Sequence, residues 1–428
     1  MSPVSFVLAA ALIAPAAELQ VKPTDWPQFR GPNRDALSPE KGLLQSWPAD
    51  GPRKAWTVSG IGGGFSTVSV VGGTIFGTGK RGGKEVIFAL KETDGSELWA
   101  TPFADARKVG YDSGTRSTPT YANGKIYAVS MDGTLACVDA TTGKEIWSKS
   151  YTRDFGGSVQ AWGYSESVLV DDGKVIGTPC STTAAMVALD ANTGNLVWKT
   201  PVTRPGGAGG YASAVKVMAG TVPMYVNLLG KDGGVVGVHA KTGRLLWQYN
   251  RIMNGTANIP AIVNKGNLVF ASTGYGDGGA ALLQMIPSAS GVTVKELKYY
   301  GAKELQNHHG GMVLVGDYIY MGRGHNNGLP TCVELKTGKI LWAEDAGAAR
   351  GSGSAAVAAA DGMIYFRYQN GVMALVKADP KGFELVSAFK LPEPSNQPSW
   401  PHPTIANGRL YIRDQDKLHA FDIKGTTN

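Results

Sequence analysis

The sequence has few of the features that usually identify an enzyme or a nucleic-acid-binding protein. It contains only three cysteines, Cys137, Cys180 and Cys332, and they show no Cys-x-x-Cys or haem-attachment spacing. The formal net charge is +7, but the charges are interspersed and no run of five basic residues occurs. Such a pattern is typical of a solvated surface, so we expect no nucleic-acid partner.

Helical periodicity, membrane-length hydrophobic runs and catalytic sequence motifs are also absent. The sequence contains no Walker loop, Gly-x-Ser-x-Gly elbow, His-Glu-x-x-His motif or calcium loop. The apolar run at residues 4–14 is too short to span a bilayer, so we expect no transmembrane span. Although no basic residue precedes this run, the small residues after it predict a signal peptide over residues 1–17. We therefore expect export to the periplasm or the cell exterior.

What the sequence does contain is a repeat of about 48 residues. Its clearest copy, residues 186–198, has alternating apolar residues, then a turn from Asp190 to Gly194, and a second strand that reaches Trp198. The side chain of Asp190 is suited to bond nearby backbone amides. Other copies keep the same spacing between glycine and tryptophan: Gly95 and Trp99, Gly143 and Trp147, Gly243 and Trp247, Gly338 and Trp342. One buried tryptophan in each copy predicts a structural girdle.

Weaker copies at residues 288–291 and 380–382 extend the repeat along most of the chain. Residues 418–422 resemble the first strand of a further hairpin, and residues 54–56 resemble a second strand with no blade before it. This period is typical of a four-stranded propeller blade. We therefore predict an all-β fold over residues 54–428, an eight-bladed β-propeller of four-stranded antiparallel blades. The N-terminal strand completes the C-terminal blade and leaves no sheet edge open.

Residues 18–53 precede the ring and are rich in proline and aromatic residues. Proline prevents a regular helix here, and Trp26 and Phe29 need burial. We predict an extended clasp that is pinned across the outside or one face of the propeller. Because a ring with all edges paired needs no partner to fold, we expect a monomer.

Departures from the repeat predict where the functional residues lie. In a blade, the segment that enters the first strand and the loop between the second and third strands emerge on the same face. Blade six places His308 and His309 in the first segment and His325 in the second, while His402 enters from blade eight. Neutral imidazoles ligate transition metals or act as acids and bases. We therefore predict a divalent-metal site of all four histidines, with His309 and His325 also as catalytic candidates.

The alternative is that these histidines only bond the loop backbone. His239 and His419 align with hairpin positions away from this mouth, and we predict structural roles for them. This division between the four histidines at the mouth and the two at hairpin positions depends on the propeller topology, which a structure tests.

Blades three, five and seven add aromatic and polar residues at the same mouth. Blade three carries Trp162, Tyr164 and Glu166 where the repeat has small residues. Aromatic faces with a few polar groups suit a sugar or a planar ligand, whereas the alternative is that Trp162 fills the channel. We take Tyr164 and Glu166 as catalytic candidates. The remaining candidates for ligand or cofactor binding are Asn258, Arg251 and Arg350, of which the arginines suit a carboxylate or a surface ion pair.

The pattern Ala-x-Asp-x-x-Thr-Gly-x-x-x-Trp, its eightfold repetition and the strand exchange resemble the pyrroloquinoline quinone (PQQ)-like repeat propellers. That family contains quinoprotein alcohol dehydrogenases and also cofactor-free propellers, including the lipoprotein subunit of the outer-membrane barrel assembly machinery. The dehydrogenase branch implies adjacent paired cysteines, which this chain lacks, and a metal held by a carboxylate and an amide, for which Glu166 and Asn258 are the matching candidates. The assembly branch implies a lipidation cysteine, which is also absent.

Three functional hypotheses follow from the sequence. The leading one is an exported propeller that binds a sugar or alcohol ligand, or another envelope protein, at its channel mouth without quinone chemistry. The second is a PQQ-dependent alcohol or sugar dehydrogenase in which Trp162 stacks on the quinone. The third is a metal-assisted carbohydrate-active enzyme that uses the four histidines of the mouth.

Overall fold

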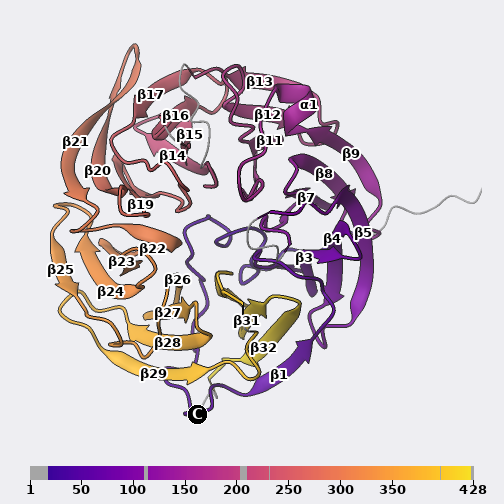
Figure 1. The fold of residues 1–428 in the computed structure, drawn as a ribbon, viewed down its shortest axis with the longest axis vertical. Helices are drawn as coiled ribbons and strands as arrows, with labels where there is room; N and C mark the ends of the chain where they lie inside the picture. Colours follow the sequence, from indigo (N-terminus) through magenta and orange to yellow (C-terminus); the bar gives the residue numbers. More distant parts are fainter. Residues whose placement is uncertain (1–17, 110–113, 203–209, 231, 396, 426–428) are drawn as a thin grey trace, which may run out of the picture.

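The structure is a computed structural model that describes residues 18–109, 114–202, 210–230, 232–395 and 397–425. The predicted signal peptide over residues 1–17 lies outside the described residues. The strands form eight four-stranded antiparallel sheets, which are arranged as blades around a central axis (Figure 1). The predicted all-β, eight-bladed propeller is therefore confirmed.

The strands follow the repeat along the chain. Blades one to four consist of β2 (Ser69–Val71), β3 (Thr74–Arg81), β4 (Lys84–Lys91) and β5 (Glu97–Asp105); β6 (Thr120–Ala122), β7 (Lys125–Val129), β8 (Thr134–Asp139) and β9 (Glu145–Ser150); β10 (Leu169–Asp171), β11 (Lys174–Gly177), β12 (Met186–Asp190) and β13 (Leu196–Thr200); and β14 (Val215–Ala219), β15 (Val222–Leu228), β16 (Val235–His239) and β17 (Leu245–Tyr249). Blades five to eight consist of β18 (Val263–Lys265), β19 (Leu268–Thr273), β20 (Gly279–Ser288) and β21 (Gly291–Gly301); β22 (Asn307–Val315), β23 (Tyr318–Arg323), β24 (Leu329–Glu334) and β25 (Ile340–Ala343); β26 (Ala355–Ala360), β27 (Met363–Tyr368), β28 (Val372–Lys377) and β29 (Leu385–Lys390); and β30 (Thr404–Ala406), β31 (Arg409–Asp414), β32 (Lys417–Asp422) and β1 (Lys54–Val58). The short helix α1 (Tyr151–Phe155) follows β9. Among the described residues, no helix has the length and apolar character needed to cross a bilayer.

Closure of the ring occurs in blade eight, as the sequence predicted. The N-terminal strand β1 is the outermost strand of this blade and pairs antiparallel with β32, with Thr57 opposite His419. The hydroxyl of Thr57 and Nδ1 of His419 are 3.0 Å apart, so this histidine is part of the closing seam. The predicted structural role of His419 agrees with this position.

A tryptophan of this kind joins four of the blades to the next one, and the repeated glycine of that next blade makes room for its ring: Trp56 over Gly95, Trp99 over Gly143, Trp147 over Gly194 and Trp198 over Gly243. In blade three, Nε1 of Trp198 donates a hydrogen bond to the main-chain oxygen of Ala240 in blade four, at 3.3 Å. Gly243 lies beneath the indole with a φ of +70°, and a Cβ atom there would lie 2.6 Å from the ring. A side chain at this position would therefore be strained and would also collide with the tryptophan. The glycine and tryptophan spacing is thus an inter-blade lock.

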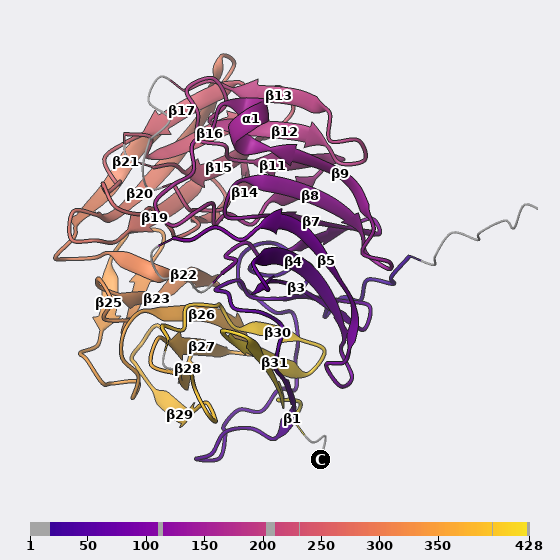
Figure 2. The ribbon, with the colours of Figure 1, turned by 45° about the vertical axis from the view of Figure 1, so that its right-hand side comes forward.

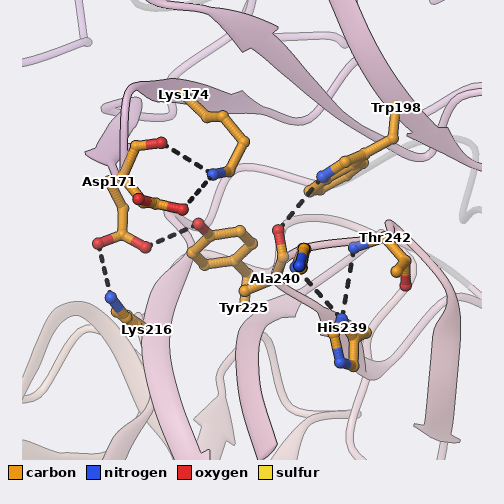
Figure 3. A network of polar contacts seen from close by, with 10 residues as sticks. Asp171, Lys174, Trp198, Lys216, Tyr225, His239, Ala240 and Thr242 are labelled. Atoms are coloured by element: carbon orange, nitrogen blue, oxygen red, sulfur yellow. Dashed lines mark hydrogen bonds and ion pairs between the residues drawn. The ribbon is translucent and has the colours of Figure 1, made fainter.

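The aspartate of the repeat organises the turn that carries this lock. Oδ1 of Asp190 accepts hydrogen bonds from the backbone amides of Asn192 and Thr193, at 3.0 and 2.9 Å. In blade four His239 takes the place of the aspartate, and its Nδ1 accepts from the amides of Lys241 and Thr242, at 3.2 and 3.3 Å (Figure 3). The predicted structural role of His239 thus has a local physical explanation.

Residues 24–44, which we call the N-terminal plug, cross the centre of the ring (Figures 1 and 2). Trp26 pairs with Val70 at the innermost strand of blade one. Further along, the amide of Ser38 donates to the main-chain oxygen of Ala359 in blade seven, at 2.9 Å. The first part of the segment predicted as a clasp therefore lies against inner strands, inside the channel. Its later part runs outside, where the amide of Trp47 donates to Ser387 in β29, the outermost strand of blade seven.

Candidate functional site

A pocket of about 350 Å³ lies at the mouth of the channel, above the N-terminal plug. It is built mainly from the segments that enter the innermost strands of the blades, the positions that the propeller topology singled out. Its aromatic lining consists of Phe29, Phe65, Trp162, Tyr211, Tyr275 and Trp400. Its polar lining consists of Arg116, Ser165, Ser167, Ser213, Thr256, His308, His309, His325, Asn326, Gln369 and His402. No carboxylate is among the lining residues that the structure describes.

The histidines of blade six lie close together in this pocket. The rings of His308 and His309 stack with centroids 3.5 Å apart and planes inclined by 27°. The ring of His325 lies 4.3 Å from that of His308. Consecutive residues of a regular strand point to opposite sides, but β22 has an irregular register between Asn307 and Met312. This bulge allows both histidines to line the same pocket.

Tyr275 of blade five holds this cluster together. Its hydroxyl lies 3.1 Å from Nε2 of His309, and its backbone amide donates to Nδ1 of His325 at 3.3 Å. Its φ is +68°, a left-handed conformation that is uncommon for an aromatic residue and recurs at functional sites. On the other side, Nδ1 of His308 lies 2.6 Å from the hydroxyl of Ser354 in blade seven. Three blades therefore cooperate to fix the imidazoles.

Burial keeps the imidazoles of His308, His309 and His402 neutral at physiological pH. Desolvation lowers the pKa of His308 to about 3, with a smaller contribution from His325. Burial, and next the positive charge of Arg30, lowers the pKa of His402 to about 3. Desolvation also holds the pKa of His309 well below its usual range. These three imidazoles are therefore neutral at pH 7, and each has one donor and one acceptor nitrogen.

The geometry of the cluster does not form a metal site in this conformation. Across the described part of the chain, no group of three or more His, Cys, Asp or Glu side chains is arranged to hold a metal ion. The lone pair of an imidazole nitrogen lies in the ring plane, so the stacked rings of His308 and His309 cannot direct their nitrogens at one ion. The proposed metal set of His308, His309, His325 and His402 thus lines one pocket, and it remains a prediction that requires these rings to move apart.

Three other predicted site residues are buried next to the pocket without lining it. The hydroxyl of Tyr164 donates to the main-chain oxygen of Pro179 at 3.0 Å. Glu166 accepts a hydrogen bond from the amide of Thr178 at 2.7 Å, and burial raises its pKa. The third residue, Asn258, donates a side-chain hydrogen bond to the main-chain oxygen of Asn254 and accepts one from the hydroxyl of Thr273.

The two predicted arginines lie away from the pocket. Arg251 pairs with Glu296 at 2.6 Å, and its guanidinium lies 3.8 Å from the centre of the Tyr299 ring on the outermost strand of blade five. Arg350 is exposed in the loop between β25 and β26. Among the predicted cofactor-binding residues, the structure therefore places only Trp162 in the pocket lining.

Several lining residues were not predicted as site residues. Phe29 comes from the N-terminal plug, and its ring contacts that of His402 edge to face at 5.2 Å. Trp400 and Phe65 lie 4.7 Å apart between ring centroids and form one wall. Tyr211 pairs with Trp162 at 5.8 Å on another. An aromatic residue at a blade opening was the available signal for three of them, whereas the place of Phe29 depends on the path of the plug.

The comparisons with known proteins agree with the geometry of the ring. The PQQ-like repeat family model described as "Outer membrane protein assembly factor BamB" matches residues 83–344, more than half of the chain. The chain belongs to this family. A BamB protein of Nitrosomonas eutropha is 24% identical over 264 residues, which cover 59% of this chain and 56% of the relative. The quinohemoprotein alcohol dehydrogenase ADH IIB of Pseudomonas putida is 26% identical over 196 residues, which cover 42% of this chain and 26% of the relative.

Solved structures with the same fold include members of both branches. BamB of Moraxella catarrhalis aligns over 88% of this chain and 98% of its own, with a TM-score of 0.61 and 15% identity. The quinohemoprotein alcohol dehydrogenase of Comamonas testosteroni aligns over 95% of this chain and 81% of its own, with a TM-score of 0.68 and 14% identity. At these identities the likeness shows the fold alone. The chain spans about half or less of the length of the curated relatives named above.

Because the PQQ-like repeat family includes quinoproteins, we tested whether this pocket fits a quinone. The three cysteines are free and buried in separate places, and none lines the pocket. Glu166 and Asn258, the candidates for the metal beside a quinone, are committed to internal hydrogen bonds outside the pocket lining. Arg116 is the one cationic side chain among the described lining residues, although the quinone carries three carboxylates. The residues present therefore do not fit the quinone.

Proposed function

We propose that this member of the PQQ-like repeat family is an exported propeller that binds a small, neutral, hydroxyl-rich ligand of the sugar class in the mouth pocket. The observation that carries the proposal is the composition of the lining, which is aromatic walls with neutral polar groups and no described carboxylate. A volume of about 350 Å³ is at the small end of the usual range for ligand pockets.

The arrangement of the aromatic rings supports a sugar in particular. Trp162 and Tyr211 form one aromatic surface, and Trp400 and Phe65 form another, so the apolar faces of a sugar ring have two surfaces to pack on. The neutral imidazoles suit hydroxyl groups, because they neither attract nor repel charge. Burial without a partner leaves Nε2 of His308 and Nδ1 of His402 unsatisfied, at a cost of about 1–3 kcal/mol each. Both nitrogens are covered in this structure, so a ligand hydroxyl reaches either one only when a lining side chain moves, and it then gains a bond that the protein itself does not supply.

Binding is favoured over hydrolysis by the same lining. Most glycoside hydrolases use a pair of carboxylates that flank the scissile bond. The described lining has none, and the buried carboxylate of Glu166 lies outside it. A metal-assisted reaction at the four histidines is the remaining enzymatic candidate, and it requires the stacked rings to separate.

A second candidate function is binding of another envelope protein at the same mouth. The match to the BamB family model favours it, because the relatives that carry this name are described as outer membrane protein assembly factors. The pocket itself argues for a smaller ligand, since a stable protein interface buries about 800 Å² on each partner. A protein partner would therefore have to use the surface around the mouth as well.

The test is titration calorimetry of the purified protein with glucose, galactose, N-acetylglucosamine and maltose. We expect binding of at least one of these sugars, and a loss of affinity of tenfold or more in Trp162→Ala. Tyr299→Ala is the matched control, because it removes an aromatic ring that contacts Arg251 outside the pocket, and its affinity should equal that of the parent. Absence of binding for all four sugars at millimolar concentration would overturn the proposal.

Elemental analysis of the same preparation separates binding from metal-assisted catalysis. Stoichiometric metal in the parent that disappears in the double variant His309→Ala, His325→Ala would favour the enzyme. Sugar binding with no bound metal would favour the binding protein.

A further inference from the structure

The N-terminal plug contacts most of the ring. The main-chain oxygen of Pro27 accepts a bond from the amide of Tyr121 in blade two, at 2.8 Å. Near its other end, the amide of Leu44 donates to Ile423 in blade eight, at 2.7 Å. With the contacts of Trp26 and Ser38 described above, the plug is held from blades one, two, seven and eight. It therefore lies across the channel axis.

Two buried arginines tie the middle of the plug to the remaining side of the channel. Arg30 is 1% exposed, and its guanidinium donates to the main-chain oxygen of Met312 in blade six. Arg34 is 2% exposed and donates to the main-chain oxygens of Ser167 and Val168 in blade three, at 2.6 and 3.1 Å. Burial lowers the pKa of Arg34 to about 9, and the nearby carboxylate of Glu166 opposes this shift. The carboxylate of Glu166 thus helps to keep the guanidinium of Arg34 protonated.

The plug backbone is strained in the same region. Arg30, Arg34 and Ala36 all have left-handed backbone conformations, with φ of 64°, 59° and 64°. Such conformations cost of order 1–3 kcal/mol each for residues other than glycine and persist only where surrounding contacts enforce them. The arginine contacts to blades three and six supply that enforcement, so the position of Phe29 beside them is fixed.

Phe29 is where the plug meets the pocket. Its ring lines the pocket and contacts the ring of His402. A Cβ atom at Gly311 would lie 2.7 Å from Nη1 of Arg30 and 3.1 Å from Cε1 of His402, so the plug packs directly against the histidine cluster. The plug therefore forms the closed end of the pocket.

We infer that Phe29 is a specificity-determining residue that sets the depth of the pocket, so that the site accepts a free saccharide or the end of a saccharide chain. A chain that threads along the propeller axis is excluded, because the plug occupies the channel. This inference rests on the proposed sugar-binding function. It extends that function from the class of ligand to the part of the ligand that enters.

The experiment compares glucose, maltose and maltotriose by titration calorimetry of the full chain and two plug variants. Phe29→Ala deepens the pocket, so we expect its affinity for glucose to fall about tenfold and its preference for maltotriose over glucose to rise at least fivefold. Leu37→Ala is the matched control: it truncates a plug residue that pairs with Ala359 and does not line the pocket. Its preference should equal that of the parent. If thermal melting shows that Phe29→Ala is unfolded, Phe29→Leu replaces it, with the same direction of change.

Hydrogen exchange of the ligand-free protein tests the plug independently of any sugar. The amide of Ser38 should be protected as strongly as those of the inner strands, since it is bonded to Ala359 in β26, and the amide of Leu44 should also be protected, since it is bonded to Ile423 at the end of β32. Exchange of these amides within seconds would show that the plug is not a fixed floor and would overturn the inference. Sugar binding with an unchanged preference in Phe29→Ala would also overturn it, while leaving the proposed function in place. If the parent binds none of the sugars, the proposed function fails and this inference fails with it.

Discussion

Histidine is used in two different ways in the two regions of this propeller. At the inter-blade turn, His239 stands in for an aspartate of the repeat and accepts hydrogen bonds from amides two and three residues further along the chain. At the mouth, His308 contacts Ser354 in another blade, 46 residues away, and its second nitrogen has no partner. Local partners satisfy the first histidine, whereas the second lines the mouth pocket and has one nitrogen without a partner.

The same contrast holds for tryptophan. Trp198 locks blade three to blade four through a main-chain hydrogen bond and a glycine that fits beneath it. Trp162 lines the pocket, and among the described residues its ring packs on that of Tyr211. We conclude that residues fixed by the repeat serve stability, and that residues that depart from it are available for binding. Three changes test this division.

The largest expected effect is on stability, from Trp198→Ala. Loss of a large buried ring, together with its bond to Ala240, should lower the free energy of unfolding by about 3–5 kcal/mol. Trp162→Ala should cost about 1 kcal/mol, since this ring is only partly buried. Urea unfolding followed by circular dichroism measures both. If both variants lost the same free energy of unfolding, the proposed division between stabilising residues of the repeat and binding residues of the mouth would be wrong.

A smaller effect is expected from the glycine beneath Trp198. Gly243→Ala adds a methyl group in a left-handed conformation and 2.6 Å from the indole, so it should destabilise by about 2–4 kcal/mol. Gly266→Ala is the matched control, because its φ is +54° and nothing lies within 4 Å of the added atom. It should cost only about 1–2 kcal/mol, which isolates the backbone strain from the collision. In thermal melting, the Gly266→Ala control should have a higher melting temperature than Gly243→Ala.

The smallest effect is a pH dependence that belongs to the mouth. The pKa of His308 is about 3 in the folded protein and near 6.5 in the unfolded chain, so the unfolded state binds the proton first as pH falls. Stability should therefore decrease as the pH falls below 6.5, and between pH 6.5 and 5 this group should account for about 1.5 kcal/mol. His308→Asn should reduce this slope when unfolding is measured from pH 6.5 to 5.

Ser354→Ala is the control for this measurement. It removes the partner of Nδ1 of His308 while it leaves the imidazole in place, so the slope should remain close to that of the parent. A slope that is unchanged in His308→Asn would contradict the assignment of acid sensitivity to this residue.

The fold was predictable because its determinants are local and repeated. The spacing of Gly194 and Trp198 recurs in each well-kept copy, and at Trp99, Trp147 and Trp198 the same contact between the ring and a glycine of the next blade explains it. The weaker turn at residues 288–291 was also predicted, and it connects the long strands β20 and β21. Trp247, which precedes that altered blade, has no partner for its Nε1. A departure from the repeat thus leaves a visible defect in the lock.

The site was predictable only in part, because the segments that enter the blades alternate between two sides. Ser165 and Ser167 line the pocket, while Glu166 between them is buried elsewhere. In blade five, Ala257 and Ile259 line it and Asn258 does not. A strand-like segment has a period of two residues, and the sequence does not specify which set faces the pocket. The adjacent residues His308 and His309 both face the pocket because of a bulge that only the structure shows.

The long reach of the plug also has a consequence for how the chain folds. Gly408 donates its amide to Glu40 across a sequence separation of 368 residues, and β1 pairs with β32 over a comparable distance. Contacts between residues so far apart in the sequence form slowly, because the entropy cost of closing the intervening loop comes first. Neither the seam of the ring nor the floor of the pocket has its partners until the last blade has been synthesised. Until then the early blades expose surfaces that have no partner. Exposed surfaces of this kind make a chain prone to aggregation, so we expect the protein to depend most on chaperones during this interval.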